Sequence, residues 1–317
     1  GISIIINLGH LISSTNGLIG LLTKYNALYA NRLVGNQSQL IPYFGSLIYI
    51  SCSLGGFVLA SRKSKNYLLY SVLPLILVLF DSIVNFGRAN LIIGFLSFFI
   101  SYFFSIYRLN DLKFSIKFSS IFKFTIIIFS LLYLLVLIRG VRGGLENYNL
   151  NKSNVVVEKL IDYGLLSPSL IIYFAAPPSV LCQTFDSNLV RMDDVPLENT
   201  FAPLSRFYES IFEKKVGRYE DYVHIGIRKS NTGTMFKDFF LDFGLIGSIL
   251  FTLILGFFWG LSHNLYLKGN YIVLYSLFGT FIIMGIFVNL FRSGQFFIPF
   301  FTTCLFYFFE KIKWKPH

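Results

Sequence analysis

The sequence predicts an all-α protein that crosses a membrane repeatedly, with about eight transmembrane helices and one large external loop domain. The 317 residues are 54% hydrophobic, 18% aromatic and only 14% charged, and the mean hydropathy is +0.64. A soluble domain, whose surface faces water, is far less apolar. The apolar stretches are also about 20 residues long, the length at which an α-helix crosses a hydrocarbon core of about 30 Å.

Eight apolar stretches are candidate transmembrane helices, with boundaries uncertain by several residues. The first is the weakest because it carries Asn7, His10 and Asn16. These stretches predict three parts of the chain: transmembrane helices over 1–138, an external loop domain over 139–238, and transmembrane helices over 239–317. The eight stretches are 2–22, 40–60, 66–86, 89–107, 122–138, 239–261, 271–290 and 296–309.

Basic residues in the loops predict the orientation. If the eight stretches alternate, loops 61–65 and 108–123, Lys268 and the tail "KIKWKPH" lie on one side, which the positive-inside rule makes cytoplasmic. The loop 139–238 then faces outward. In this arrangement nine of the eleven arginines lie outside, but only seven of the sixteen lysines do.

Arginine in the outer loops indicates anion binding. In the predicted cytoplasmic loops, lysine supplies most of the positive charge that sets the orientation. Arginine differs because its planar guanidinium group binds phosphate or carboxylate with two parallel hydrogen bonds. Arg88, Arg139, Arg142 and Arg292 lie close to the predicted membrane boundary. Each could serve instead as an anchor to lipid headgroups. Together they favour a ligand with an anionic head and an apolar part in the membrane, such as a lipid phosphate or pyrophosphate.

Within the outer loop, "LLSPSLIIYFAAPP" (165–178) predicts a short helix. Pro168 suits a first helical turn, and the pair Pro177 and Pro178 is expected to stop the helix. The apolar run of about ten residues is too short to span a bilayer. Two interpretations remain open, an interfacial or re-entrant helix and a core helix of the external domain.

The segment "IRKSNTGTMFKDFFLDFGLIG" (227–247) ends the outer loop and enters the next predicted span. Asp242 is expected just inside the membrane boundary, where an ionisable residue either serves a functional site or pairs with a neighbouring Arg or Lys. Gly244 and Gly247 are expected to give the helix a small face for close packing.

A second polar group is predicted near the outer end of another span. Asp81, Asn85 and Arg88 are spaced i, i+4 and i+7, so a helix would place them on one face. They form either a polar stripe toward the external groove or a salt bridge between two helices.

Other classes of site are not indicated. Cys52, Cys182 and Cys304 are too widely spaced for a zinc or redox motif, so no metal and no cofactor is predicted. The net charge of +11 comes mostly from the cytoplasmic loops, so it is a topology signal rather than a sign of nucleic-acid binding.

Three short motifs resemble the Wzy-type O-antigen polymerases, a family of oligosaccharide repeat unit polymerases. They are "GRANLI" at the start of a span, "RGVRGG" at the opening of the long loop, and "NTGTMFKDFFLDFGLIG" leading into the next span. The resemblance covers about 42–309. Members of this family usually have more spans, which predicts further helices before residue 1.

The resemblance implies a multi-pass glycosyltransferase of polysaccharide and lipopolysaccharide biosynthesis in the bacterial inner membrane, with its active site facing the periplasm. Such an enzyme transfers a glycan from undecaprenyl pyrophosphate onto another undecaprenyl-linked oligosaccharide repeat unit. It inverts the anomeric configuration and needs neither a metal nor a cofactor. Its expected partners are the lipid-linked oligosaccharide, membrane lipids and a chain-length regulator.

Site residues follow from this reaction. Guanidinium groups would stabilise the charge that develops on the departing pyrophosphate, and the candidates are Arg88, Arg139, Arg142, Arg228 and Arg292. His224, the one histidine of the outer loop, is a candidate general base because histidine titrates near neutral pH. Asp242, Glu220 and Asp221 are the alternatives, and the sequence does not choose among them.

Competing functions remain open at this point. An O-antigen ligase or a membrane acyltransferase would also use a groove open to lipid. A flippase or transporter for lipid-linked oligosaccharides would tend to have short loops, charges in mid-membrane and repeat symmetry. The long outer loop and the outward arginines argue against a transporter.

Overall fold

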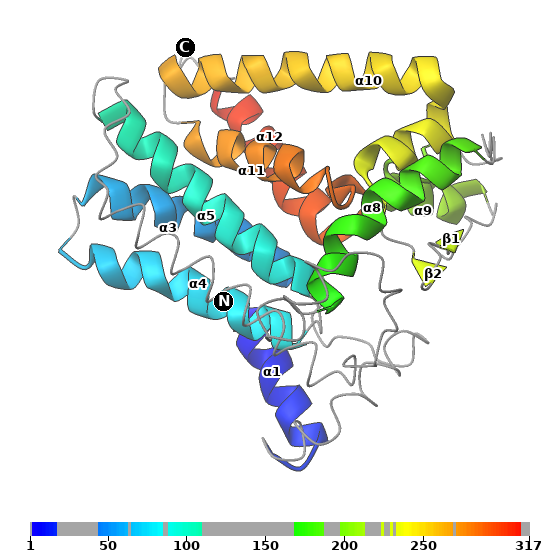
Figure 1. Cartoon of the computed structure of the whole chain (residues 1–317). Coiled ribbons are helices and arrows are strands. Elements are labelled where there is room, and N and C mark those ends of the chain that lie inside the picture. Colours follow the sequence, from blue (N-terminus) through cyan, green and yellow to red (C-terminus); the bar gives the residue numbers. More distant parts are fainter. Residues whose placement is uncertain are drawn as a thin grey trace. The chain divides into compact units, whose positions relative to one another are not determined.

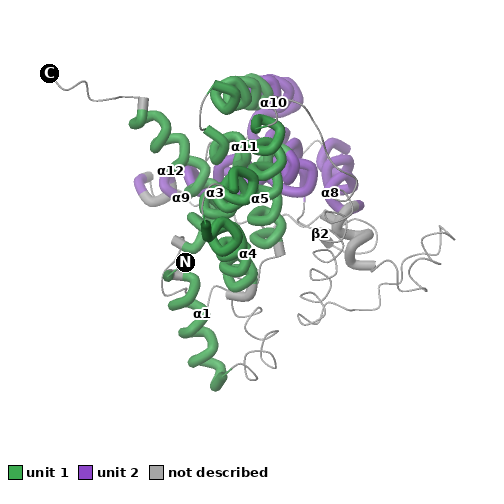
Figure 2. Tube along the Cα trace, turned by 90° about the vertical axis from the view of Figure 1, so that its left-hand side faces the viewer, with its two compact units in different colours: residues 1–129, 255–282, 294–317 green, residues 130–254, 283–293 purple. Residues whose placement is uncertain are grey.

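The computed structural model describes residues 2–17, 44–62, 65–84, 88–109, 168–186, 197–212, 223–224, 229–230, 233–268 and 271–311. The predicted span 122–138 and the candidates Arg139, Arg142, Glu220, Asp221 and Arg228 lie outside these residues. The chain divides into two compact units, coloured green and purple in Figure 2. The described residues are helical except for loops, turns and one short two-stranded ladder.

Unit 1 consists of residues 1–129, 255–282 and 294–317. Helices α3, α4 and α5 pack on one another in this unit (Figure 1). Its described elements are α1 (Ile2–Ser14), η1 (Phe44–Leu47), α3 (Ile48–Ser61), α4 (Tyr67–Val84), α5 (Arg88–Leu109), most of α11 (Ile272–Met284), α12 (Gly294–Lys311) and the C-terminal part of α10 (Met235–Lys268).

Small residues and hydroxyl groups hold the helices of unit 1 together. A side chain on Gly56 of α3 would collide with the carbonyl oxygen of Phe98 in α5, so only glycine permits this close approach. Ser101 Oγ donates to the Ser53 carbonyl oxygen at 2.6 Å, and Ser276 Oγ donates to Ser53 Oγ at 2.8 Å. Interfaces of small residues with hydrogen bonds between helices are typical of membrane-spanning bundles.

The buried Asp81 links α4 to α5. Its Oδ2 accepts a hydrogen bond of 2.8 Å from Nδ2 of Asn90. Asn85 and the side chain of Arg88 lie outside the described residues. The contact at Asp81 therefore joins two helices, and the predicted stripe with Asn85 and Arg88 stays a prediction.

Two helices of the described part, residues 89–109 and α10, are long and apolar enough to cross a membrane. Only 28% of the most apolar window of α10 is buried, against 50% for 89–109. A core helix of a soluble protein would be mostly buried, so the exposed apolar face of α10 favours contact with lipid. The other predicted spans within the described residues contain helices that do not meet this test, and eight transmembrane helices are not confirmed.

Some of the shorter helices end at identifiable backbone features. α1 ends at Ser14, and the next residues include Asn16 and Gly17 with φ of 59° and 100°. α11 ends at Met284, where the N–H groups of Phe287 and Val288 both donate to the Met284 carbonyl oxygen in a turn. The positive φ values at Asn16 and Gly17 are incompatible with continuation of α1.

Within α10, the helix breaks at Gly244, which has φ 66° and ψ −173°. This region of backbone space is open essentially to glycine alone. The bend is visible in the yellow part of α10 in Figure 1. The expectation that Gly244 provides a packing face is wrong: among the described residues no atom lies within 4 Å of the position that its Cβ would take, and its role is conformational.

Unit 2 consists of residues 130–254 and 283–293. Its described elements are α8 (Pro168–Asp186), α9 (Ala202–Phe212), β1 (Val223–His224), β2 (Lys229–Ser230), the N-terminal part of α10 and η2 (Leu290–Arg292). Strands β1 and β2 pair antiparallel. The predicted loop domain 139–238 falls inside this unit, and whether it faces outward stays a prediction.

Helix α8 begins at Pro168, as the sequence predicts, but it does not stop at the proline pair. Pro177 and Pro178 lie inside the helix, which continues to Asp186. Each proline lacks the N–H that would bond to the residue four positions earlier. The helix therefore tolerates the loss of two backbone hydrogen bonds, and the expected stop is wrong.

Candidate functional site

Two aspartates at the start of α10 form the centre of a polar network in unit 2. Asp238 and Asp242 are four residues apart, so they lie on the same face of the helix. Thr234 precedes the helix, and its Oγ1 accepts a hydrogen bond of 3.4 Å from the backbone N–H of Lys237. This is the pattern of an N-terminal cap. The cap thus sets where the helix begins and which face carries the two carboxylates.

Asp242 holds the turn that precedes α9. Its Oδ1 accepts hydrogen bonds from N and Nδ2 of Asn199 at 3.1 and 2.9 Å, and its Oδ2 accepts one from the Thr200 N–H at 2.6 Å. Bonds between N–H donors and a carboxylate are among the stronger ones in proteins. The turn needs such support because Leu197, at its start, has a φ of 65°, which is costly for a branched side chain.

Asp238 forms an ion pair with Arg292. Its Oδ1 lies 3.2 Å from Nη1 of Arg292, and the side chains are 4% and 16% exposed. Arg292 ends η2, a single 3-10 turn whose N-cap is Asn289: Oδ1 of Asn289 accepts from the Phe291 N–H at 3.1 Å. The nearly buried carboxylate and the capped turn together fix the base and the tip of the arginine side chain.

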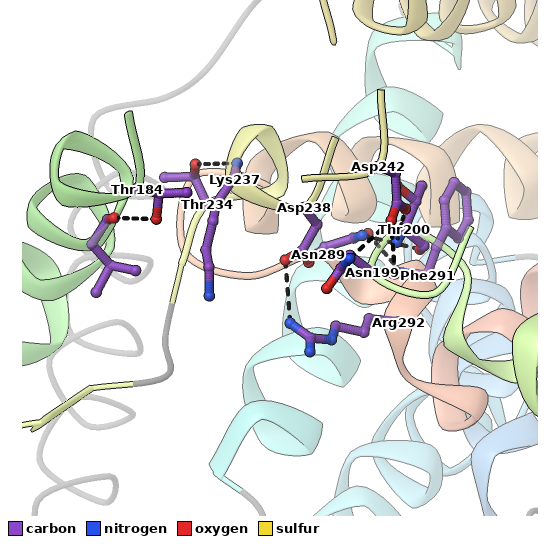
Figure 3. A network of polar contacts seen from close by, with 11 residues as sticks. Thr184, Asn199, Thr200, Thr234, Lys237, Asp238, Asp242, Asn289, Phe291 and Arg292 are labelled. Carbon is purple, nitrogen blue, oxygen red and sulfur yellow. Dashed lines mark hydrogen bonds and ion pairs between the residues drawn. The ribbon is translucent and has the colours of Figure 1, made fainter. Parts of the chain in front are cut away.

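The two aspartate contacts are joined into a closed ring, shown in Figure 3. Nδ2 of Asn289 donates to the Thr200 carbonyl oxygen at 3.0 Å. The ring runs from Asp238 to Arg292, through η2 to Asn289, on to Thr200 and Asp242, and back along α10. The start of α10, the turn η2 and the turn before α9 are therefore each bonded to the other two. This restricts the guanidinium group of Arg292 to one place.

Aromatic side chains surround this circuit of polar contacts. The rings of Phe201 and Phe291 stack with centroids 5.4 Å apart, and Phe239 meets Phe251 edge to face at 4.7 Å. Phe239 is fully buried. Such an apolar setting lowers the local dielectric constant and strengthens the polar contacts inside it.

The structure brings together two of the predicted site residues, Asp242 and Arg292, in this one network. His224 lies in β1 opposite Lys229, and Arg88 is the first residue of α5 in unit 1; the side chains of both lie outside the described residues. Arg139, Arg142 and Arg228 also lie outside them. The proposed roles of these five residues stay predictions.

The sequence did not single out Asp238, Asn199 or Asn289. Asp238 lies at the end of the predicted loop, and only its spacing of four from Asp242 could have indicated a shared face. The two asparagines come from separate segments, and nothing in a single sequence reveals that they meet. Asp242 was expected either in the site or paired with a cation; its described partners are N–H groups, and the cation belongs to Asp238.

Within the described part of the chain, no group of three His, Cys, Asp or Glu side chains is placed to hold a metal ion. The chemistry that this network offers is that of a fixed cation in a largely apolar setting. Fold and network together define a helical protein with two helices long and apolar enough to cross a membrane. Comparison with known proteins gives no significant match to a family model, a curated protein or a solved structure.

Proposed function

We propose that this protein is a Wzy-type glycosyltransferase of the bacterial inner membrane. In this proposal it transfers a glycan from undecaprenyl pyrophosphate onto another undecaprenyl-linked repeat unit, at a site facing the periplasm, and so builds O-antigen or another surface polysaccharide. Support comes from the three sequence motifs, the predicted outward segregation of arginine and the polar network at the start of α10.

The observation that carries the proposal is the fixed position of Arg292. Its guanidinium group is restrained by Asp238, and its turn is restrained through Asn289. Only 16% of the side chain is exposed. A cation held in advance of substrate binding stabilises developing charge without reorganisation.

The second part of α10 supports a lipid substrate. Beyond the break at Gly244, still within unit 2, the helix exposes a run of large apolar side chains. A donor with a pyrophosphate head and a polyprenyl tail needs a fixed cation and an apolar surface. Asp238, which pairs with Arg292, and the apolar run lie within a few turns of each other along α10. The exposed residues are Leu245, Ile246, Ile249, Leu250, Leu253 and Ile254.

In the proposed reaction, a hydroxyl oxygen of the acceptor sugar attacks the anomeric carbon of the donor glycan. The bond from that carbon to the pyrophosphate oxygen breaks, its electron pair leaves with the pyrophosphate, and the hydroxyl proton passes to a general base. Direct displacement inverts the anomeric configuration. Arg292 would stabilise the negative charge of the leaving group, together with Arg139, Arg142, Arg228 and Arg88.

For the general base, the contacts of Asp242 favour His224. Both carboxylate oxygens of Asp242 already accept N–H bonds that hold the turn at Asn199 and Thr200, so protonation would weaken that turn. His224 belongs to the predicted outer loop, and a histidine suits proton transfer near neutral pH. The proposal therefore places His224 ahead of Asp242 as base.

Deletion of the gene in its own bacterium tests the proposal against its alternatives. Loss of a polymerase leaves single repeat units on the final carrier, and this is the expected result. Loss of a ligase removes all transferred glycan, and loss of a flippase traps the lipid-linked unit in the cytoplasm. Either of these two outcomes would reject polymerase activity and replace it with the corresponding function.

A further inference from the structure

Lys237, next to Asp238, is an almost fully buried lysine. Only 3% of the residue is exposed, and removing an ammonium group from water is costly. It also lies in the first turn of α10, where the helix dipole disfavours a positive charge. Lys237 therefore keeps a positive charge next to Asp238, with which it interacts electrostatically.

Lys237 and Arg292 act on the same carboxylate. Both cations interact electrostatically with Asp238. In Figure 3 the side chain of Lys237 points down from the start of α10, and that of Arg292 reaches from η2 toward Asp238. The site thus combines a compact ammonium charge with a planar guanidinium group. These are the two kinds of side chain that proteins use to bind phosphoryl groups.

Gly233 provides the space for Lys237. A Cβ added to Gly233 would lie 2.5 Å from Cδ of Lys237 and 3.4 Å from its Cβ and Cγ. The backbone of Gly233 does not have the positive φ that would itself require glycine. The physical reason for glycine at this position is therefore the path of the lysine side chain, which explains two positions of the segment "NTGTMFKDFF" at once.

We propose that Lys237 is a second cation of the anion site, and that it binds the pyrophosphate group of the donor together with Arg292. Asp238 is the positioning residue for Arg292, and Gly233 keeps the path of the lysine side chain open. This inference rests on the proposed function, because that function supplies a pyrophosphate to bind. It adds a ligand-binding lysine and a supporting glycine to the site.

The test is a binding measurement on the purified full chain in lipid nanodiscs, with farnesyl pyrophosphate as the probe. Lys237→Ala is expected to raise Kd about tenfold or more, the usual effect of losing a charge-assisted hydrogen bond. Gly233→Ala is expected to weaken binding severalfold although no charge changes, since it displaces the lysine. Lys268→Ala, at the opposite end of α10, is the matched control and should leave Kd unchanged.

Thermal unfolding of each variant separates binding from folding. Gly233→Ala should unfold close to wild type, because the flexible end of a lysine side chain can move aside. Wild-type Kd in both Lys237→Ala and Gly233→Ala, with weaker binding in Arg292→Ala, would overturn this inference and leave the proposed function standing. Wild-type protein that binds farnesyl pyrophosphate no better than farnesol would overturn both.

Discussion

At the scale of single residues, Arg292 and Asp242 have different tasks although one network contains both. Arg292 ends a short turn and keeps a partly exposed side chain. Asp242 directs both carboxylate oxygens at the turn before α9. The first arrangement leaves a cation within reach of a ligand, and the second ties two chain segments together. Substitutions should separate these tasks.

Arg292→Lys should impair glycan polymerisation while leaving the fold intact. Lysine keeps the charge and a contact to Asp238 but loses the planar fork, so the polymerisation rate is expected to fall about tenfold or more. Glycan ladder length at equal membrane protein level measures the effect, with the exposed Arg62→Lys as control. Full-length ladders from Arg292→Lys would reduce Arg292 to a structural ion pair.

Asp242→Asn should destabilise the protein. The substitution removes the charge and places an amide N–H₂ group against N–H donors of Asn199 or Thr200. Each lost charge-assisted bond costs about 1.5–3 kcal/mol. A lower unfolding temperature in detergent is the expected result, while Asp186→Asn at the exposed end of α8 should unfold like wild type. A stable Asp242→Asn protein without transferase activity would instead identify Asp242 as the general base.

At the scale of elements, periodicity and hydropathy predicted much of what is described. Helices occur within seven of the eight predicted stretches, and α8 begins at Pro168. Ends and breaks were predicted less well. The stop at Pro177 and Pro178 failed because a helix can lose two hydrogen bonds and continue. The break at Gly244 was missed because the sequence does not distinguish a glycine that allows close helix packing from a glycine that adopts a positive φ.

The break in α10 should depend on glycine. Gly244→Ala forces a Cβ into φ 66° and ψ −173°, at a cost of about 1–3 kcal/mol. Gly256→Ala is the matched control in the same helix, since a Cβ there meets no atom of the described part of the chain within 4 Å and alanine is the better helix former by up to about 1 kcal/mol. We expect a lower unfolding temperature for the first variant only. Equal unfolding temperatures would show that residue 244 does not need glycine.

At the scale of the whole molecule, the sequence predicted an all-helical membrane protein. The described residues are mainly helical, with one short pair of strands, and two helices meet the length and hydropathy test. The candidate site was predicted only in part. Arg292 and Asp242 were found because ionisable residues near apolar spans are conspicuous. Asn199 and Asn289 were missed because their polar contacts join segments far apart in the chain, and sequence periodicity carries no information on such contacts.

The orientation of the chain in the membrane is a prediction of the basic residues in its loops. We expect 139–238 to face the periplasm, because the lysine-rich loops are best placed in the cytoplasm. Ser153→Cys and Ser187→Cys, each made with Cys182 replaced, should react with a membrane-impermeant thiol reagent that reaches the periplasm of otherwise intact cells. Reaction only after cell lysis would reverse the orientation and remove the outer arginines from any periplasmic site.

Reconstitution of the purified protein tests the central claim most directly. Lipid-linked oligosaccharide extracted from the deletion strain would be incorporated into proteoliposomes with the protein as the only enzyme, and the glycan lengths would be measured over time. The account predicts products of two and more repeat units, released undecaprenyl pyrophosphate in step with each linkage, and slower growth with Arg292→Lys. Glycans that remain single repeat units on their lipid, with folded wild-type protein present, would contradict polymerase activity.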